Sequence, residues 1–470
     1  MNALFTDCYE LTMGNSLFLE GKQNKQAVFD LFFRKVPENG GYAIFAGLEA
    51  IVAYINNLKF TKEDIEFLKR EFKFCEEYLN ALENINFECD IYSVPEGTPI
   101  FPHEPIMRVS GPIWQCMLIE VALLNAVSYQ SLIATKASRI VKASEGKDVI
   151  EFGARRAQGE TATIWGARSA YIGGCVGVSV VEAGQKFEIP VAGTMAHSFI
   201  QAFGNDYDAF SAYAQAFPEN CVFLLDTYDT LKSGLPSAIK VAKEKNIKLK
   251  AVRIDSGDLA YLAKKVRLGL DENGTQDCKI IASNALDEYK IRDLIADQNA
   301  PIDIFGVGEN LITGGAEPVF SGIYKLAEFD GKPCMKFSDN KAKTTIPGEK
   351  ELYRLYDKET GKAIADVVCL ADEIIEEPYK LFSPDDPLKH KMANNFIAKK
   401  LLQPIYEKGK LVYDLPKAKT IRGYCKEQKE TLWEELKRFN FPHKYYVDLS
   451  QKLYDLREQL RQEQLTKTAE

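Results

Sequence analysis

The sequence predicts an α/β protein built around an irregular α/β barrel, with an N-terminal α+β domain and a C-terminal extension of β-hairpins and helices. Between residues 148 and 313, short apolar runs recur roughly every 25–35 residues, and most precede a helical stretch, as in repeated strand-plus-helix units. After residue 320 the pattern changes to paired strands around short turns. A chain of 470 residues is too long for one compact core. We therefore expect three domains, at residues 1–112, 113–322 and 323–470.

The N-terminal region mixes both kinds of element. Residues 27–33 form an aromatic-rich run that predicts a strand, and residues 62–82 place their apolar side chains on one helical face. Thr61 and Asp64 have the spacing of a capping box, which marks the start of that helix. Residues 114–145 carry a second apolar stripe at helical spacing, which we interpret as core packing.

The candidate catalytic and binding residues lie in the barrel region, because polar or glycine-rich residues follow its predicted strands. In parallel α/β proteins, ligands bind at the carboxyl ends of the strands. The predicted strands are residues 149–152, 176–181, 187–192, 221–225, 249–254, 279–282 and 303–305. The polar candidates at their ends are Arg155, Arg156, Thr194, His197, Asp226, Asp229, Arg253, Asp255, Asp258, Ser283, Asn284 and the loop 306–310.

Residues 193–199, Gly-Thr-Met-Ala-His-Ser-Phe, are the centre of this set. The chain has four histidines, and His197 alone follows a predicted strand of the barrel. A histidine there serves catalysis, or it satisfies a local hydrogen bond. The residues by themselves leave both interpretations open.

The residue types at the strand ends fit a phosphorylated sugar. Arginine forks bind phosphate or carboxylate, and neighbouring carboxylates hold a divalent cation or sugar hydroxyls. The Gly306-Val307-Gly308 turn exposes backbone N–H groups to an anion. Neither a Gly-x-Ser-x-Gly elbow nor a His-Glu-x-x-His pair occurs in the sequence. Each Arg–Asp pair taken singly is also compatible with a structural ion pair at the barrel rim.

Composition excludes several classes. The net charge of −8 argues against a nucleic-acid binder. The ten cysteines are scattered without a C-x-x-C pair, which disfavours a zinc knuckle and fits a reducing compartment. The first twenty residues lack the pattern of a signal peptide, and no apolar run is long enough to span a membrane. We expect a cytoplasmic protein.

The C-terminal region predicts two hairpins and a tail. Residues 324–329 and 334–337 pair around Asp330-Gly331, and residues 352–356 and 363–370 pair around Thr360-Gly361. Residues 429–465 are predicted to be helical, with a leucine stripe that packs on the body or on a partner chain.

Several motifs in order resemble the nicotinate phosphoribosyltransferases, a family of type II phosphoribosyltransferases. The resemblance covers almost the whole chain. Its motifs are Thr6-Asp-Cys-Tyr9, Phe33-Arg-Lys-Val-Pro37 with Gly40-Gly-Tyr42, Glu151-Phe-Gly-Ala-Arg-Arg-Ala-Gln-Gly159, Gly193–Phe199, Arg253-Ile-Asp-Ser-Gly-Asp258, Ser283-Asn284, Gly306-Val-Gly308 and the lysine-rich run ending at Pro347-Gly348.

The resemblance implies an ATP-dependent, ligase-type transfer in NAD salvage. Nicotinate, phosphoribosyl pyrophosphate and ATP would give nicotinate mononucleotide, pyrophosphate, ADP and phosphate, with Mg²⁺ on the pyrophosphate and a phosphohistidine as the coupling device. The expected assembly is a homodimer with shared active sites, without nucleic-acid or membrane partners.

The resemblance also implies residue roles. His197 is the expected phosphorylated and catalytic histidine, with Asp255 as the second catalytic residue. Tyr9, from the neighbouring subunit, stacks on nicotinate, which Thr194 and Arg253 also hold. The residues expected around the phosphoribosyl group are Arg155, Ser283, Asn284, Gly306, Gly308 and Glu309. Glu309 is larger than the small residues expected in such a cradle, so it would bind phosphate through its backbone N–H.

Three alternatives stay open. The nearest is a nicotinamide phosphoribosyltransferase. Another is a different phosphate-binding α/β-barrel enzyme, such as an aldolase or a phosphosugar isomerase, although the strand ends carry Arg and Asp rather than a Schiff-base lysine. The third is a nucleotide-sensing protein on an inactive barrel.

Overall fold

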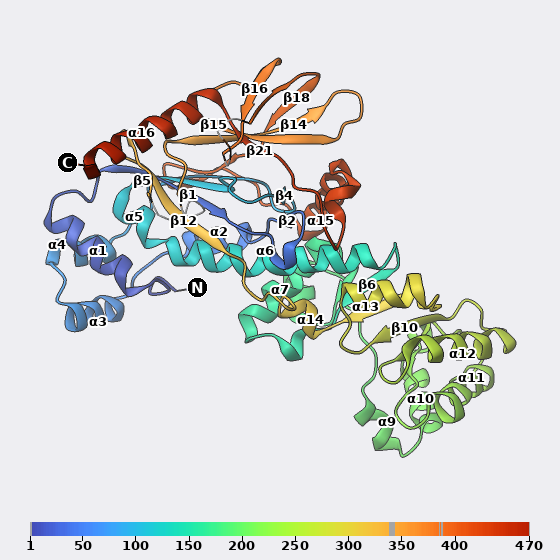
Figure 1. Ribbon diagram of the computed structural model, residues 1–470. Coiled ribbons are helices and arrows are strands. Elements are labelled where there is room, and N and C mark those ends of the chain that lie inside the picture. Colours follow the sequence, from blue (N-terminus) through green and yellow to red (C-terminus); the bar gives the residue numbers. More distant parts are fainter. Residues whose placement is uncertain (1, 338–343, 385, 387–388, 470) are drawn as a thin grey trace. The chain divides into compact units, whose positions relative to one another are not determined.

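The computed structural model describes residues 2–337, 344–384, 386 and 389–469 (Figure 1). The chain forms two compact units. The first unit contains Met1–Leu132, Val319–Pro416 and Gly423–Glu470, and the second contains Ile133–Pro318 and Lys417–Arg422. Both ends of the chain thus belong to the same compact unit. The three predicted domains, at residues 1–112, 113–322 and 323–470, stay a prediction.

The first unit is built on mainly antiparallel sheets, with one parallel pair between β15 and β21. Strands β1 and β12 lie far apart in the sequence and pair from Ala27–Phe329 to Phe33–Gly322 (Figure 1). The first sheet has the order β13 (Lys332–Pro333), β12 (Gly322–Phe329), β1 (Gln26–Phe33), β5 (Met107–Pro112), β3 (Asp90–Ser93), β19 (Gln403–Glu407) and β20 (Lys410–Leu411). The second has the order β17 (His390–Ala393), β16 (Tyr379–Phe382), β21 (Val447–Leu449), β15 (Ala363–Leu370), β14 (Lys350–Asp357) and β18 (Phe396–Lys400). Strands β2 (Ala43–Ile44) and β4 (Pro99–Ile100) form a third, small sheet.

Helices of this unit pack around an aromatic cluster. Tyr78 and Trp114 are buried there, and both contact the ring of Phe18. The helices at this cluster are α1 (Cys8–Leu19), α3 (Lys62–Phe72), α4 (Glu76–Glu83) and α5 (Ile113–Leu118), and the unit also contains α2 (Leu48–Asn56) and α16 (Gln451–Ala469). Helices α6 (Glu120–Ala143) and α15 (Ala418–Thr431) each have residues in both units.

The helix predicted over residues 62–82 is broken in two. The Thr61 capping box is confirmed, but Lys73 ends α3 in the left-handed conformation, with φ at 54°. Successive helical residues are rotated by about 100°, so a continuous helix would separate Phe72 from Phe74. The break lets their rings stack, with centroids 5.2 Å apart, against the same core. The helix predicted over 114–145 is likewise two helices, α5 and α6.

The predictions for the C-terminal region are partly wrong. The hairpin of β14 and β15 is confirmed, whereas the partner of β12 is Lys332–Pro333 rather than residues 334–337. The tail is not one helix, because β21 interrupts it and pairs with β15. Pro442 cannot donate a helical hydrogen bond, and Phe441 before it has a φ of 49°. Of the lysine-rich run, residues 338–343 lie outside the described residues.

The second unit contains the predicted α/β barrel sheet, so the predicted fold class is confirmed. Its six strands are parallel throughout. Their order is β7 (Gly177–Val178), β6 (Asp148–Glu151), β11 (Ile304–Val307), β10 (Lys279–Ser283), β9 (Ala251–Ile254) and β8 (Val222–Leu224). The helices are α7 (Glu160–Gly173), α8 (Val181–Phe187), α9 (His197–Phe203), α10 (Asp206–Ala216), α11 (Leu235–Glu244), α12 (Leu259–Glu272), α13 (Glu288–Arg292) and α14 (Glu309–Ile312) (Figure 1).

The prediction of a strand over residues 187–192 is wrong. Phe187 closes α8, and only Val191 pairs, through a parallel bridge to Val178 of β7. Pro190 has no N–H to donate, which prevents a longer ladder. The bridge still directs the chain along β7, so the segment that begins at Gly193 leaves at the carboxyl end of the sheet.

Candidate functional site

Arg253 is the best-connected side chain at the strand ends of the second unit. It lies in β9, and its guanidinium donates from three different nitrogens. Nε donates to the Ser283 hydroxyl at 2.8 Å, Nη1 to the Thr194 hydroxyl at 3.2 Å, and Nη2 to Asp255 at 2.7 Å. The Phe152 ring lies below the guanidinium, 5.6 Å from its carbon. Three separate segments of the chain, around Thr194, Asp255 and Ser283, therefore meet at one cation.

His197 lies beside the same carboxylate. Its Nδ1 is 3.1 Å from the Thr227 hydroxyl, and its Nε2 is 3.7 Å from the second oxygen of Asp255. The ring is partly exposed. The structure thus gives His197 both a local hydrogen-bond partner and an ionic neighbour, while leaving it open to solvent.

Asp255 is held as an anion. Burial raises its pKa, but a hydrogen bond from Ser283 and the charge of Arg253 outweigh the burial, so the pKa lies below its usual range. The backbone N–H of Asp255 donates to Asp226 at 3.2 Å, and the Ser256 hydroxyl also donates to Asp226. Asp226 therefore shapes the turn on which Asp255 sits.

The turn after β6 offers two cations. Residues Ala154–Arg156 form a short 3₁₀ turn in which Arg155 and Arg156 are exposed. The carboxylate of Glu309 lies 3.8 Å from Nε of Arg156. The Glu309 side chain therefore faces a cation at the surface.

The two glycines at the end of β11 are packed too closely for larger residues, Gly306 within the strand and Gly308 directly after it. A Cβ on Gly306 would lie 2.6 Å from the Phe152 ring. Gly308 precedes α14, and a Cβ there would lie 3.2 Å from the Phe152 carbonyl oxygen. Glycines at these positions let the loops after β6 and β11 come together.

The segment after β10 is strained. Asn284 has a φ of 112° and Ala285 a φ of 45°, in a region that larger side chains avoid. The Asn310 amide donates to the carbonyl oxygens of Ala285 and Leu286, at 3.0 and 3.2 Å. Strain held by neighbouring structure clusters at functional sites.

The structure brings most of the predicted site residues to one edge of the sheet. Thr194, His197, Arg253, Asp255 and Ser283 are joined directly by the contacts above. Arg155, Asn284, Gly308 and Glu309 lie on segments that follow strands of the same sheet, whereas Gly306 lies within β11 rather than in the predicted loop 306–310. Tyr9 lies on α1 of the other unit, where it shares a hydrogen bond with Glu120.

Two contacts were missed in the sequence. Thr227 directly follows Asp226 after a predicted strand, so its place in the chain could have identified it. Phe152 was read only as part of a strand, although its ring supports Arg253.

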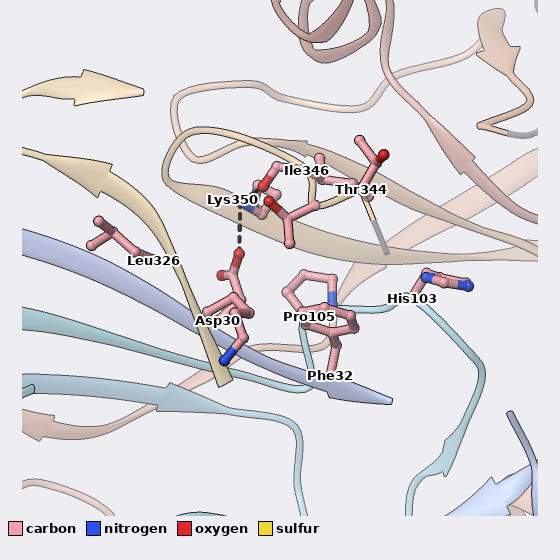
Figure 2. A pocket seen from close by; sticks show the side chains of 10 residues that line it. Asp30, Phe32, His103, Pro105, Leu326, Thr344, Ile346 and Lys350 are labelled. Carbon is pink, nitrogen blue, oxygen red and sulfur yellow. Dashed lines mark hydrogen bonds and ion pairs between the residues drawn. The ribbon is translucent and has the colours of Figure 1, made fainter. Parts of the chain in front are cut away.

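A cavity in the first unit is unsuitable for a substrate (Figure 2). Its volume is about 20 Å³, the size of a single water. Lys350 and Asp30 form a 2.7 Å ion pair on its wall, and Lys350 also donates to the carbonyl oxygens of Ile346 and Gly348. Lys350 is thus bound entirely by groups of the fold, so we interpret the pair as structural.

The described residues contain no group of three or more His, Cys, Asp or Glu side chains arranged to hold a metal ion. No helix in the described part of the chain has the length and hydropathy needed to cross a membrane.

Taken together, a parallel sheet whose strand ends gather an Arg–Asp–His cluster and closely packed glycine turns defines an α/β-barrel enzyme for an anionic, phosphorylated substrate. Residues 4–128 match the N-terminal domain of nicotinate phosphoribosyltransferase, residues 148–371 match the nicotinate phosphoribosyltransferase family, and residues 349–457 match its C-terminal domain. The chain belongs to the nicotinate phosphoribosyltransferase family.

Individual relatives agree. A nicotinate phosphoribosyltransferase of Bacillus subtilis is 45% identical over 457 residues, which cover 96% of this chain and 93% of the relative. One from Homo sapiens is 31% identical and covers 96% and 95% of the two chains. Among solved structures, human nicotinic acid phosphoribosyltransferase superposes with a TM-score of 0.85 at 28% identity, covering 97% and 99% of the two chains. The nicotinate-nucleotide pyrophosphorylase of Pyrococcus furiosus gives 0.71 at 26% identity, covering 91% and 95%. The predicted family is confirmed, and the protein is a phosphoribosyltransferase.

Proposed function

We propose that the protein transfers the phosphoribosyl group of phosphoribosyl pyrophosphate to nicotinate in NAD salvage, and couples the transfer to ATP hydrolysis. The observation that carries the proposal is the guanidinium of Arg253. Its described contacts use three of its five N–H groups and leave one on each terminal nitrogen. Two parallel N–H groups match a carboxylate, which nicotinate has and nicotinamide lacks.

The reaction needs position and charge rather than a base. The ring nitrogen of nicotinate has a free lone pair, which forms the new bond to the sugar carbon while the bond to pyrophosphate breaks. Positive charge develops on the ribose, and the lowered pKa of Asp255 keeps an anion available to stabilise it. Arg155 and the backbone N–H groups of Gly308 and Glu309, which directly follow β11, are the proposed ligands of the donor's phosphates.

Mg²⁺ fits the acidic pair of the site. Mg²⁺ is usually bound by one or two carboxylates together with substrate phosphates, so a cage of three protein ligands is unnecessary. Asp226 has a buried oxygen without a hydrogen-bond partner among the described residues, and it lies next to Asp255. These two residues would hold the ion, which would neutralise charge on the departing pyrophosphate.

His197 is the proposed phosphohistidine. A phosphate there would add about two negative charges next to Asp255, which lies 3.7 Å from Nε2. Repulsion between these anions would move Asp255 and release N–H groups of Arg253 for substrate. This gives ATP a physical route to change the affinity for substrates.

A homodimer with shared sites is the proposed assembly. Phe5, Tyr9 and Met13 recur every four residues on and just before α1, and all three are partly exposed. Such a stripe fits contact with a second copy. The cysteines, all present as free thiols, support the proposed cytoplasmic location.

The decisive experiment compares nicotinate with nicotinamide at equal concentrations in a turnover assay. We expect formation of nicotinate mononucleotide at least about 100-fold faster than formation of the amide product, by the arithmetic of one lost charge-assisted ion pair. Equal rates would contradict the proposal.

The ATP coupling is tested with γ-labelled ATP. Wild type should retain acid-labile label, and His197→Ala should retain none. His390→Ala, which changes an exposed histidine of β17, is the matched control and should label like wild type. Equal labelling of all three proteins would overturn the assignment of His197.

A further inference from the structure

Glu151 is a buried acid inside the site that the proposed reaction does not use. It is the last residue of β6, where it pairs with Val307 of β11 and Val178 of β7. Its side chain is fully buried. Burial raises its pKa to about 7, against the effect of the Gly153 N–H. A strand interior normally takes an apolar residue at such a position, so the acid requires an explanation.

The carboxyl of Glu151 is bound to the turn that carries the two arginines. One oxygen accepts a hydrogen bond from the backbone N–H of Gly153. The other oxygen is buried without a hydrogen-bond partner among the described residues. The Glu151 side chain therefore fixes the first residue of the turn on which Arg155 and Arg156 lie.

The same contact reaches the second loop of the site. A Cβ on Gly153 would lie 2.5 Å from Ile312 of α14 and 2.8 Å from the Glu151 carboxyl oxygen. Gly153 is thus held between Glu151 on one side and α14 on the other. Helix α14 begins directly after Gly308, which follows β11, so the position of Gly153 sets the separation of the two segments.

We propose that Glu151 is a positioning residue for the phosphoribosyl donor. Its carboxyl holds the 153–156 turn against α14, so that Arg155 and the backbone of Gly308 and Glu309 keep the spacing that the donor's phosphates require. The inference rests on the proposed function, which assigns both loops to the donor. It adds a residue that touches neither substrate.

Two substitutions of Glu151 distinguish the loss of its hydrogen-bond acceptor from a change in the volume of its side chain. Glu151→Gln keeps an oxygen for the Gly153 N–H, and Glu151→Met keeps the length but removes the acceptor. We expect Glu151→Gln to hold the KM for phosphoribosyl pyrophosphate within about twofold of wild type, and Glu151→Met to raise it about tenfold, the loss of about one hydrogen bond's stabilisation. The KM for nicotinate should change less than twofold in both.

Matched controls exclude a general packing defect. Ile150→Met alters the neighbouring buried position of β6 and should leave the KM of both substrates within about twofold. Should Glu151→Met not fold, Glu151→Asp withdraws the carboxyl from Gly153 and should raise the KM for the donor about threefold. Equal increases in both KM values, or equal donor KM values for the Gln variant and the Met or Asp variant, would overturn the proposal.

Donor binding measured by calorimetry, with Mg²⁺ and without nicotinate, separates this inference from the proposed function. Wild type that binds the donor but does not form nicotinate mononucleotide contradicts the function alone, because donor affinity still tests Glu151. Glu151→Met with wild-type donor affinity contradicts the role of Glu151 alone. Failure of wild type to bind the donor contradicts both.

Discussion

Each unit contains an arginine–aspartate pair, and the two pairs differ in what surrounds them. In the first unit, Arg354 and Asp366 are both fully buried, joined by bonds of 2.8 and 2.6 Å, and the Tyr445 hydroxyl adds a third bond to Asp366. In the second unit, Arg253 and Asp255 are joined at 2.7 Å, but their side chains are 14% and 28% exposed.

The difference separates a structural pair from one available to a ligand. Arg354 also donates to the Pro99 carbonyl oxygen and lies over the Phe101 ring, so its partners all belong to the folded unit. The described contacts of Arg253 leave two of its N–H groups unused, and its partner Asp255 also lies beside the partly exposed His197. The presence of an Arg–Asp pair at a barrel rim therefore does not show whether the pair binds a ligand. Its solvent exposure and the number of arginine N–H groups without a partner in the fold distinguish a binding pair from a structural one.

The largest effect on stability is expected from breaking the buried pair. Asp366→Ala leaves the charge of Arg354 buried and unpaired, which should cost about 3–5 kcal/mol of unfolding free energy. Denaturant titration of wild type and variant measures it. Asp277→Ala, which removes an exposed partner of Lys248, is the control and should cost less than about 0.5 kcal/mol. Similar losses in the two variants would show that burial does not distinguish them.

Arg253→Ala should lower activity strongly and stability only slightly, the reverse of what we expect for Asp366→Ala. We expect kcat/KM for nicotinate to fall about 100-fold, since a charged hydrogen-bond partner is worth about 2–3 kcal/mol. Unfolding free energy should change by less than about 1 kcal/mol, because the group is partly solvated. Steady-state kinetics against both substrates measures the first effect, with Arg70→Ala on an exposed helix as the control. A fall in stability as large as that of Asp366→Ala would make Arg253 a structural residue.

The convergence of the site could be predicted because it follows from local pattern and topology. The segments that carry Arg253, Asp255 and Ser283 were recognisable as short apolar runs followed by polar residues. Parallel pairing then brings their ends to one edge. Thr194 joins them even though its predicted strand is only a single bridge, because one parallel contact at Val191 is enough to direct the chain.

The features that the sequence did not predict depend on tertiary packing. The break at Lys73 lets Phe72 and Phe74 share a core, and no local signal in the helical pattern required it. Glu151 stands in a predicted strand without any periodicity that marks a buried acid. The sequence also placed Tyr9 in the site only by resemblance, since its role requires another subunit and no residue pattern within one chain specifies that contact.

Glu10 differs from both arginine–aspartate pairs, because it is a buried acid with no cation among the described groups that shift its pKa. It is 1% exposed in the first unit, and burial raises its pKa to about 8. The folded state therefore holds a proton that the unfolded state, with a pKa near its ordinary 4.5, has lost. The associated stability is present below about pH 4.5 and is lost as the pH rises through about 8.

Glu10→Gln removes this dependence. Relative to wild type, the variant should gain about 1–2 kcal/mol between pH 5 and pH 8, a fraction of the linkage that the pKa shift allows. Thermal unfolding at a series of pH values measures the difference. Glu20→Gln, at the exposed end of the same helix, is the control, and its stability should depend on pH in the same way as that of wild type. A constant difference between Glu10→Gln and wild type across that range would mean that Glu10 is ionised in the folded protein.

The smallest effect is expected at the exposed pair of the second unit. Arg156 and Glu309 are 3.8 Å apart, and their side chains are 67% and 46% exposed, so solvent screens their attraction. Glu309→Ala should change unfolding free energy by less than about 0.5 kcal/mol. If residue 309 serves the donor through its backbone N–H, the KM for phosphoribosyl pyrophosphate should also stay within about twofold, at low and at high salt. A rise that disappears at high salt would assign the carboxylate a role in orienting Arg156, and would place this exposed pair with Arg253 and Asp255 rather than among the ordinary surface contacts.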